Sequence, residues 1–198
     1  MARTISRRSS SSRAARSTAT RSNSSGDAVA LLKRDHRTVE RLFREFESAD
    51  GSEQVAGHVC DLLTVHARIE EEILYPAARE AFADDEEDSE LVHEAAVEHA
   101  TAKELIHKIQ GMGEADEEFK ATVKVLSEYI KHHVKEEERR AEGMFAQARK
   151  AGLDIAALGE RMAGRKAELL AEYRKDGLPM PEPVTFHATH MGEARRAA

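Results

Sequence analysis

Proline is nearly absent from the first 178 residues of this 198-residue chain. Pro76 is the only proline in that stretch, and the other three follow residue 178. A proline inside a helix removes a backbone hydrogen bond and clashes with the preceding turn, so its absence allows long uninterrupted helices. Charged residues make up 34% of the sequence and aromatic residues 5%, with alanine, leucine, glutamate, lysine and arginine abundant. This composition is typical of a helical protein.

Apolar residues recur at helical spacing in five segments, and no segment has the alternation of a strand. The segments are about 27–50, 52–76, 91–110, 116–138 and 154–175, and the fourth extends less clearly to residue 152. We expect Ser52 to cap the second segment and Pro76 to bend or end it. The acidic run Asp84–Asp88 is expected to be a solvated connection before the third.

Short connections between long amphipathic helices favour antiparallel neighbours. The sequence therefore predicts an all-α fold, an antiparallel up-down four-helix bundle over residues 27–150. An additional amphipathic helix over residues 151–176 is expected to pack on the bundle or against another copy. Its apolar stripe is narrow, which is why a second copy remains an alternative.

The charge is unevenly distributed along the chain. The net charge is −7, yet residues 1–26 contain six arginines and no acidic residue, which leaves −13 on the remainder. An acidic body does not bind nucleic acid through its overall field. The Ser/Arg-rich composition of residues 1–26 predicts a disordered, solvated arm, with loose contact to a polyanion as the alternative. The mixed composition of residues 177–198 predicts a flexible tail.

The single cysteine, Cys60, excludes a disulfide framework and fits a cytoplasmic location. No apolar run approaches the ~20 residues that a membrane span requires. The N-terminus has arginines but no apolar core segment, so it does not resemble a secretory signal. We therefore expect a cytoplasmic protein without membrane contact.

Two pairs of histidine and glutamate, His66–Glu70 and His133–Glu137, are spaced four residues apart. Four residues correspond to about 400° of helix rotation, so both side chains of a pair project from one face, one turn apart. An imidazole and a carboxylate aimed at one point are good ligands for iron, and less selectively for manganese or zinc. The two pairs therefore predict a metal site.

The second pair has an alternative register. His132 and Glu136 have the same spacing on a face rotated by ~100°. We expect His133 and Glu137 to face the core because Ile130 lies on the same side. The neighbouring acids Glu71, Glu72 and Glu138 are expected to be plain surface charge.

Single histidines occupy similar positions in the other two bundle segments. His36 follows Leu32 on an apolar stripe, and His99 lies among small alanines. Each bundle helix thus offers one histidine that can face inward. Four imidazoles and two carboxylates could hold two metal ions, with the carboxylates bridging, and leave a position open for a small ligand.

These motifs resemble those of the hemerythrin-like (HHE cation-binding) family over about residues 27–150. The matching stretches are Asp35-His36-Arg37-Thr38-Val39-Glu40, His66-Ala67-Arg68-Ile69-Glu70, Glu98-His99 and His132-His133-Val134-Lys135-Glu136-Glu137. The resemblance implies a non-haem di-iron site whose six ligands are His36, His66, Glu70, His99, His133 and Glu137. Family members bind or sense dioxygen, nitric oxide, peroxide or iron itself.

The chain departs from the family pattern at two places. Oxygen-carrying hemerythrins have a further histidine four residues after the one on the third helix, where this chain has Lys103. This departure argues against reversible oxygen carriage. The family also usually has Glu-x-Phe-Pro soon after the last ligand pair. Here Met144-Phe145 follows about three residues later and without proline, which predicts a bulged or extended end of the fourth helix.

Tyr129 lies one turn before His133. A core tyrosine with a satisfied hydroxyl is the default interpretation. Our hypothesis is that its hydroxyl reaches the open metal position or hydrogen-bonds to what binds there, which would make Tyr129 a residue that contacts the bound ligand.

The sequence thus predicts a non-haem di-iron protein that binds, senses or detoxifies a small oxidant or gas, namely dioxygen, peroxide or nitric oxide. The two iron ions would be oxo- or carboxylate-bridged, with manganese or zinc as alternatives. No residue beyond the ligands is an evident acid or base, so enzymatic turnover stays open. The alternative function is a metal-stabilised helical scaffold that acts through protein or polyanion contacts of the fifth helix or the basic arm.

Overall fold

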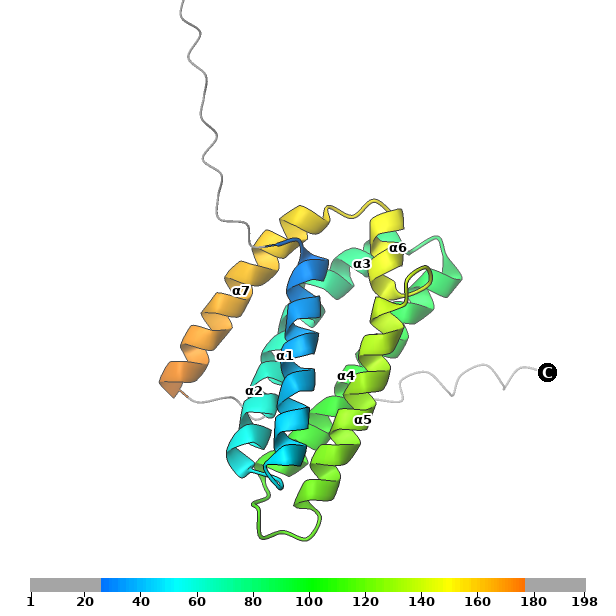
Figure 1. The fold of residues 1–198 in the computed structure, drawn as a ribbon. Coiled ribbons are helices and arrows are strands. Elements are labelled where there is room, and N and C mark those ends of the chain that lie inside the picture. Colours follow the sequence, from blue (N-terminus) through cyan, green and yellow to red (C-terminus); the bar gives the residue numbers. More distant parts are fainter. Residues whose placement is uncertain (1–25, 177–198) are drawn as a thin grey trace, which may run out of the picture.

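Residues 26–176 are described by a computed structural model, and this part of the chain is helical without any strand (Figure 1). In chain order the elements are α1 (Ala28–Ser48), α2 (Glu53–Ile69), the π-helix η1 (Glu70–Leu74), α3 (Tyr75–Ala81), α4 (Glu86–Gln110), α5 (Phe119–Glu138), α6 (Met144–Lys150) and α7 (Ile155–Asp176). The arm and the tail predicted from the sequence lie outside the described residues, apart from Gly26.

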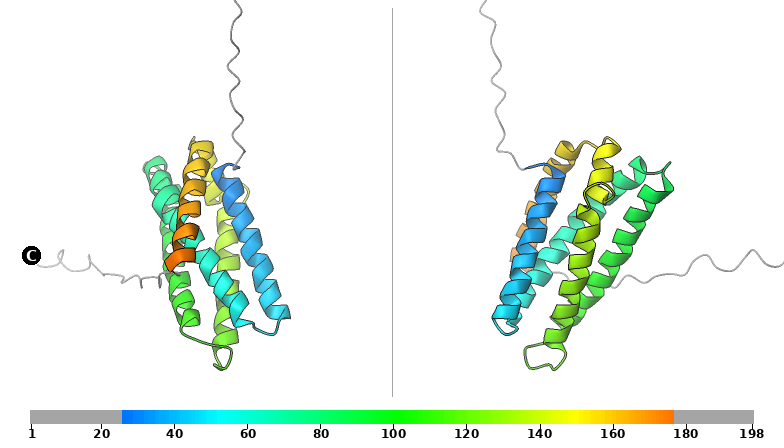
Figure 2. Two further views of the ribbon diagram at one scale, coloured as in Figure 1. Left: turned by 90° about the vertical axis from the view of Figure 1, so that its left-hand side faces the viewer. Right: turned by 45° about the vertical axis from the view of Figure 1, so that its right-hand side comes forward.

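The four long segments of the bundle are α1, the continuous run α2–η1–α3, α4 and α5. Helix α1 packs against α2 and α5, and α4 packs against α2 and α5, so the four form a closed ring (Figures 1 and 2). The predicted all-α bundle with an additional C-terminal helix is confirmed. The second segment does not end at Pro76, because η1 leads directly into α3, which continues to Ala81.

Side chains from different segments define the ends of α1 and α2. The carboxylate of Asp27 accepts a hydrogen bond of 2.8 Å from the Ala30 amide and so caps α1. Ser52 is the N-cap residue of α2, as predicted, but its side chain makes no capping hydrogen bond. Instead the Glu114 carboxylate, from the connection between α4 and α5, accepts the Glu53 amide at 2.7 Å.

The connection before α4 is shorter than the sequence predicts. Helix α4 begins at Glu86, and Asp85 accepts a hydrogen bond of 3.1 Å from the Asp88 amide as its cap. Acidic residues in a first turn interact favourably with the positive end of the helix dipole, so most of the acidic run is helical.

Helix α7 lies across the outer side of the bundle, against α1, α2 and η1 (Figure 2, left). Its own residues Met162 and Leu169 are almost completely buried. A Cβ atom at Gly159 would lie 2.6 Å from the Ala28 backbone nitrogen, so the glycine permits close approach to α1. Of the two placements expected for this helix, packing on the bundle is the one observed.

Two apolar clusters fill the bundle, one at each end. The upper cluster, at the end of α3, α6 and the start of α7, includes Leu32, Ile69, Leu74, Phe82 and Met162. The lower cluster, toward the α1–α2 and α4–α5 connections, includes Val39, Phe46, Val59, Ile106 and Leu126. None of the helices in the described part of the chain combines the length and apolarity that a bilayer crossing requires.

Candidate metal centre

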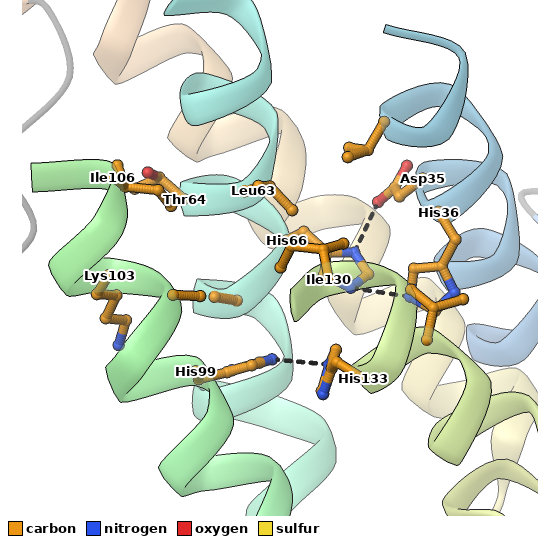
Figure 3. A pocket seen from close by; sticks show the side chains of 14 residues that line it. Asp35, His36, Leu63, Thr64, His66, His99, Lys103, Ile106, Ile130 and His133 are labelled. Atoms are coloured by element: carbon orange, nitrogen blue, oxygen red, sulfur yellow. Dashed lines mark hydrogen bonds and ion pairs between the residues drawn. The ribbon is translucent and has the colours of Figure 1, made fainter. Parts of the chain in front are cut away.

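A layer of buried histidines separates the two apolar clusters. His36 of α1, His66 of α2 and His99 of α4 each lie between residues of the upper and the lower cluster along their own helices, and His133 of α5 follows Ile130 of the lower cluster. Their Nε2 atoms meet in pairs, at 3.1 Å between His36 and His66 and 3.2 Å between His99 and His133 (Figure 3). One inward histidine from each bundle helix therefore reaches a common interior region.

Two buried glutamates link the histidine pairs. An oxygen of Glu70 lies 3.2 Å from His66 Nε2 and 3.3 Å from His99 Nε2. The two oxygens of Glu137 lie 3.4 Å from His36 Nε2 and 3.5 Å from His133 Nε2. Each glutamate thus contacts one histidine of each pair.

All six residues predicted as ligands are brought together. They form two groups that share Glu70 and could each hold a metal ion: His36, His66, Glu70 and Glu137, and Glu70, His99 and His133. The ligand atoms within each group lie within 4.8 Å of one another. Of the two registers in α5, His133 and Glu137 are buried, whereas the His132 side chain is 57% exposed.

The carboxylate oxygens of Glu70 and Glu137 fit a metal site because nothing in the described protein satisfies them. Both side chains are almost fully buried, and none of their four oxygens has a hydrogen-bond partner of suitable geometry. A buried carboxylate without a partner is strongly unfavourable. Cations surrounded by imidazole nitrogen and carboxylate oxygen would remove this penalty, so the donor set fits iron, manganese or zinc.

An outer carboxylate faces the other ring nitrogen, Nδ1, of every histidine in the layer. The distances from Nδ1 are 2.9 Å for His36 to Glu138, 3.5 Å for His66 to Asp35, 3.2 Å for His99 to Glu71 and 2.7 Å for His133 to Glu98. A carboxylate at Nδ1 favours the tautomer protonated there and leaves the Nε2 lone pair free for a metal.

These outer carboxylates follow a rule that sequence reasoning missed. Each outer carboxylate is the immediate chain neighbour of one ligand, but it contacts the histidine of the next helix in the ring. The contacts run from α1 to α2, from α2–η1 to α4, from α4 to α5 and from α5 to α1. The expectation that Glu71 and Glu138 are plain surface charge is therefore wrong. The available signal was an acidic residue next to four of the ligands, His36, Glu70, His99 and Glu137. The histidine that each acid faces on another helix could not be inferred from the periodicity of one helix.

Three of the four outer carboxylates form ion pairs with lysines. Lys33 lies 3.2 Å from Glu138, Lys103 lies 2.6 Å from Glu71, and Lys166 pairs with Asp35. Lys103, the residue that departs from the oxygen-carrier pattern, thus supports the carboxylate at His99. The outer carboxylates have these cations, whereas Glu70 and Glu137 have no lysine or arginine partner in the described residues.

Tyr75 is a site residue that the sequence prediction missed. Its side chain is fully buried, and its hydroxyl lies 3.0 Å from His99 Nε2. Burial, together with the nearby carboxylates led by Glu70, raises the pKa of Tyr75 well above its ordinary value, so the phenol stays protonated. Tyr129, the tyrosine proposed from the sequence, is half-buried against the lower cluster instead.

The π-helix η1 explains why Tyr75 faces the site. Nine residues of regular α-helix after His66 would turn Tyr75 to the opposite face, about 180° away. In η1 the Tyr75 amide instead bonds the Glu70 carbonyl, five residues earlier, so one extra residue fits into the turn. Pro76 follows at once and has no N–H for an α-helical bond. The proline marked the irregular turn in the sequence, but not its direction.

A cavity of about 20 Å³ lies against the four histidines on the side of the lower cluster (Figure 3). Its apolar lining comes from Val39, Leu63, Ala67, Ala102, Ile106, Ile130 and Val134. A space of about 10–15 Å³ is the minimum for one water molecule, so this cavity admits one molecule of that size and little more. A surface groove of about 360 Å³ between α1 and α5 shares His36, Ile130 and Val134 with the cavity.

Without metal, the cluster holds protons. Burial lowers the pKa of His66, but the charge of Glu70 and the contact with Asp35 outweigh it and raise the pKa to about 10. Burial and the charge of Glu70 raise the pKa of Glu137 to about 8. Protons and cations therefore compete for the same donors.

Comparisons with known proteins agree with this geometry. The family model described as the Hemerythrin HHE cation binding domain matches residues 27–145. A curated relative, a DNA nickase from Nostoc sp. strain PCC 7120, is 30% identical over 111 residues. That match covers 54% of this chain and 30% of the relative, so the chain spans less than a third of that relative's length.

A solved structure shares the fold. The crystal structure of a Hemerythrin HHE cation binding domain-containing protein from Mycobacterium kansasii matches with a TM-score of 0.62 and 21% sequence identity. The match covers 77% of this chain and 95% of that one.

Proposed function

Because the chain belongs to the hemerythrin HHE cation-binding domain family, we propose that its histidine layer holds two iron ions and that the protein binds, senses or detoxifies a small oxidant or gas. One observation carries the proposal. Glu70 and Glu137 are buried between two histidine pairs, and none of their oxygens has a hydrogen-bond partner. Cations are the partners that this arrangement lacks.

The roles of the six inner residues follow from their contacts. His36 and His66 would hold one ion, and His99 and His133 the other, with Glu70 and Glu137 shared between them. Iron bound there would supply reversible one-electron oxidation and reduction and an open position for a small molecule.

The chain's own residues orient the donors and exclude water. Hydrogen bonds from Nδ1 to an outer carboxylate at His36, His99 and His133 would leave the Nε2 lone pairs aimed at the centre, and Asp35 faces His66 Nδ1 in the same way at 3.5 Å. The upper and lower clusters close both ends of the layer, which strengthens the electrostatic interactions inside. The phenol of Tyr75 places one buried hydrogen-bond donor beside His99.

The cavity limits what can bind. At about 20 Å³, with an apolar lining, it fits a molecule of two or so heavy atoms, such as dioxygen, peroxide or nitric oxide. A larger organic substrate does not fit this cavity.

Metal analysis of the freshly purified full chain tests the proposal. We expect two iron ions per chain and an absorption band of bridged ferric iron, both lost in the double variant His66→Ala/His133→Ala. His107→Ala is the matched control, since this α4 histidine is exposed. The proposal is wrong if the wild-type protein takes up no iron after anaerobic loading, or if His107→Ala loses as much as the double variant.

The cavity is tested separately by filling it. Ala102→Val places two methyl groups in the chamber and should weaken binding of nitric oxide or azide at least tenfold at unchanged iron content. Ala56→Val is the control, because Ala56 on α2 is likewise buried in the lower cluster but does not line the cavity. Equal affinities in both variants would contradict binding in this cavity.

A second candidate function is contact with a polyanion through residues 1–26. Six arginines in that segment and the name of the DNA nickase relative favour it. Deletion of residues 1–25 should then abolish retention of the protein on DNA at low salt. Unchanged retention would contradict this candidate. A scaffold role in which α7 binds another protein is less well supported, because its apolar face is already buried on the bundle.

A further inference from the structure

Helix α7 lies beyond residues 27–145, which match the family, yet it contributes a charge to the histidine layer. Lys166 of α7 pairs with one carboxylate oxygen of Asp35. The other oxygen of Asp35 faces His66 Nδ1 at 3.5 Å (Figure 3). A chain of three side chains thus runs from the additional helix to a residue at the centre.

We propose that α7 contributes to the metal centre. Lys166 holds Asp35 in position, and Asp35 in turn orients His66. The inference rests on the proposed metal binding and adds a dependence that the six inner residues alone do not contain. Docking of α7 then sets how tightly the half of the centre formed by His36 and His66 holds its ion.

Of the four contacts between an outer carboxylate and a histidine, the one between Asp35 and His66 depends most on a further residue to hold the carboxylate in place. At 3.5 Å it is the longest of the four contacts between an outer carboxylate and Nδ1. Neither His66 Nδ1 nor the facing Asp35 oxygen has a hydrogen bond of good geometry. A small movement of Asp35 would therefore bring its oxygen into or out of hydrogen-bonding distance of His66 Nδ1.

The pair of Lys166 and Asp35 is sheltered enough to fix that position. Their side chains are 22% and 16% exposed, so water and salt screen the pair less than a surface ion pair. Two of the remaining outer carboxylates, Glu138 and Glu71, have lysine partners within the family-matched residues, Lys33 and Lys103. Of these three lysines, only the one that pairs with Asp35 comes from α7.

Other contacts hold α7 in place independently of Lys166. Met162 and Leu169 of α7 are almost completely buried. The neighbouring Arg165 pairs with both carboxylate oxygens of Glu72, at 2.6 and 3.3 Å. Removing the charge of Lys166 should therefore leave α7 docked, and Arg165 provides a control on the same helix that does not touch Asp35.

The test compares three variants of the full chain, Lys166→Met, Lys166→Arg and Arg165→Met, after removal of metal. Each is titrated with Co²⁺ as the probe, followed by visible absorption and by competition with a chelator, and its thermal unfolding is recorded. We expect Lys166→Met to weaken one of the two Co²⁺ sites by about 10–100-fold and to change its spectrum. Lys166→Arg should restore both, and Arg165→Met should lower the melting temperature while leaving both affinities unchanged.

The outcomes separate this inference from the proposed function. Two tight Co²⁺ sites in both the wild-type protein and Lys166→Met would overturn the role of Lys166 and leave metal binding intact. Equal weakening in Lys166→Met and Arg165→Met would show that α7 acts only as a structural cover, which also overturns it. A wild-type chain that takes up no Co²⁺ would overturn both ideas.

Discussion

At the scale of single residues, Glu70 and Glu137 behave differently although both are buried. Burial opposes ionisation of Glu70, but the adjacent imidazoles, led by His66, hold the pKa of Glu70 well below its ordinary value. Burial and the charge of Glu70 both oppose ionisation of Glu137, and together they raise the pKa of Glu137 to about 8. The metal-free protein should therefore carry one negative charge and one protonated carboxyl at neutral pH.

This difference predicts how the metal-free protein responds to pH. The pKa of Glu137 is about 8 in the folded state against 4.5 for an ordinary glutamate, so the folded state holds the proton more tightly. Its contribution to stability is complete below about pH 4.5 and is lost as pH rises through 8. Between pH 5 and 8 the melting temperature should fall more steeply in the wild-type protein than in Glu137→Gln. Parallel curves would contradict the raised pKa.

Two tyrosines give a second test at this scale. Tyr75→Phe removes the hydroxyl at His99 and should destabilise the metal-free protein by roughly 1 kcal/mol, the usual net value of a hydrogen bond. In the iron-loaded protein it should alter azide or nitric oxide affinity at unchanged iron content. Tyr129→Phe is the control and tests the expectation drawn from the sequence. An effect of Tyr129→Phe alone would favour Tyr129 as the ligand-facing residue.

At the scale of elements, the end of α5 determines where Glu137 lies. Helix α5 ends at Glu138, and residues 139–143 form the loop that leads into α6. Phe145 of α6 then stacks on the His36 ring, with centroids 6.0 Å apart and planes inclined by 12°. The predicted bulge or extension at this point is a short loop that returns an aromatic ring to the histidine layer.

Gly143 is the residue that makes this turn possible. A Cβ atom there would lie 2.6 Å from the Glu137 carbonyl oxygen and 2.7 Å from the Arg139 nitrogen, both in the backbone. Gly143→Ala should therefore displace the last turn of α5, destabilise the protein and weaken metal binding. Gly164→Ala in α7 has open space around it and should instead stabilise by about 0.5–1 kcal/mol. Thermal unfolding and metal titration measure both, and unchanged metal affinity in Gly143→Ala would contradict the coupling.

These elements also show what the sequence could and could not predict. The bundle and the placement of the six inner residues followed from periodicity, because His66 and Glu70 repeat one helical turn apart on a regular helix. Tyr75 did not follow, because η1 interrupts that regularity. Asp35 and Glu138 did not follow either, because each acts on a histidine of another helix, and a single sequence does not give the rotation of one helix against its neighbour.

At the scale of the whole molecule, metal binding and folding should be linked. The ligands come from four helices, so an ion bound to them stabilises the folded state alone. Metal at about 100 times its dissociation constant should add about 2.7 kcal/mol of stability. Calorimetry should show a higher melting temperature with Zn²⁺ in the wild-type protein and none in His66→Ala/His133→Ala. An equal shift in both would place the stabilising ion elsewhere.

The division of the core into an upper and a lower cluster has a consequence for how the chain opens. With protons alone between them, the two ends are held together mainly by the continuity of the helices. Amide hydrogen exchange in the chelated protein should then reveal two units that open separately, the lower one along α1–α2 and α4–α5. Once ions join Glu70 and Glu137 to all four helices, both halves should exchange through a single, global opening.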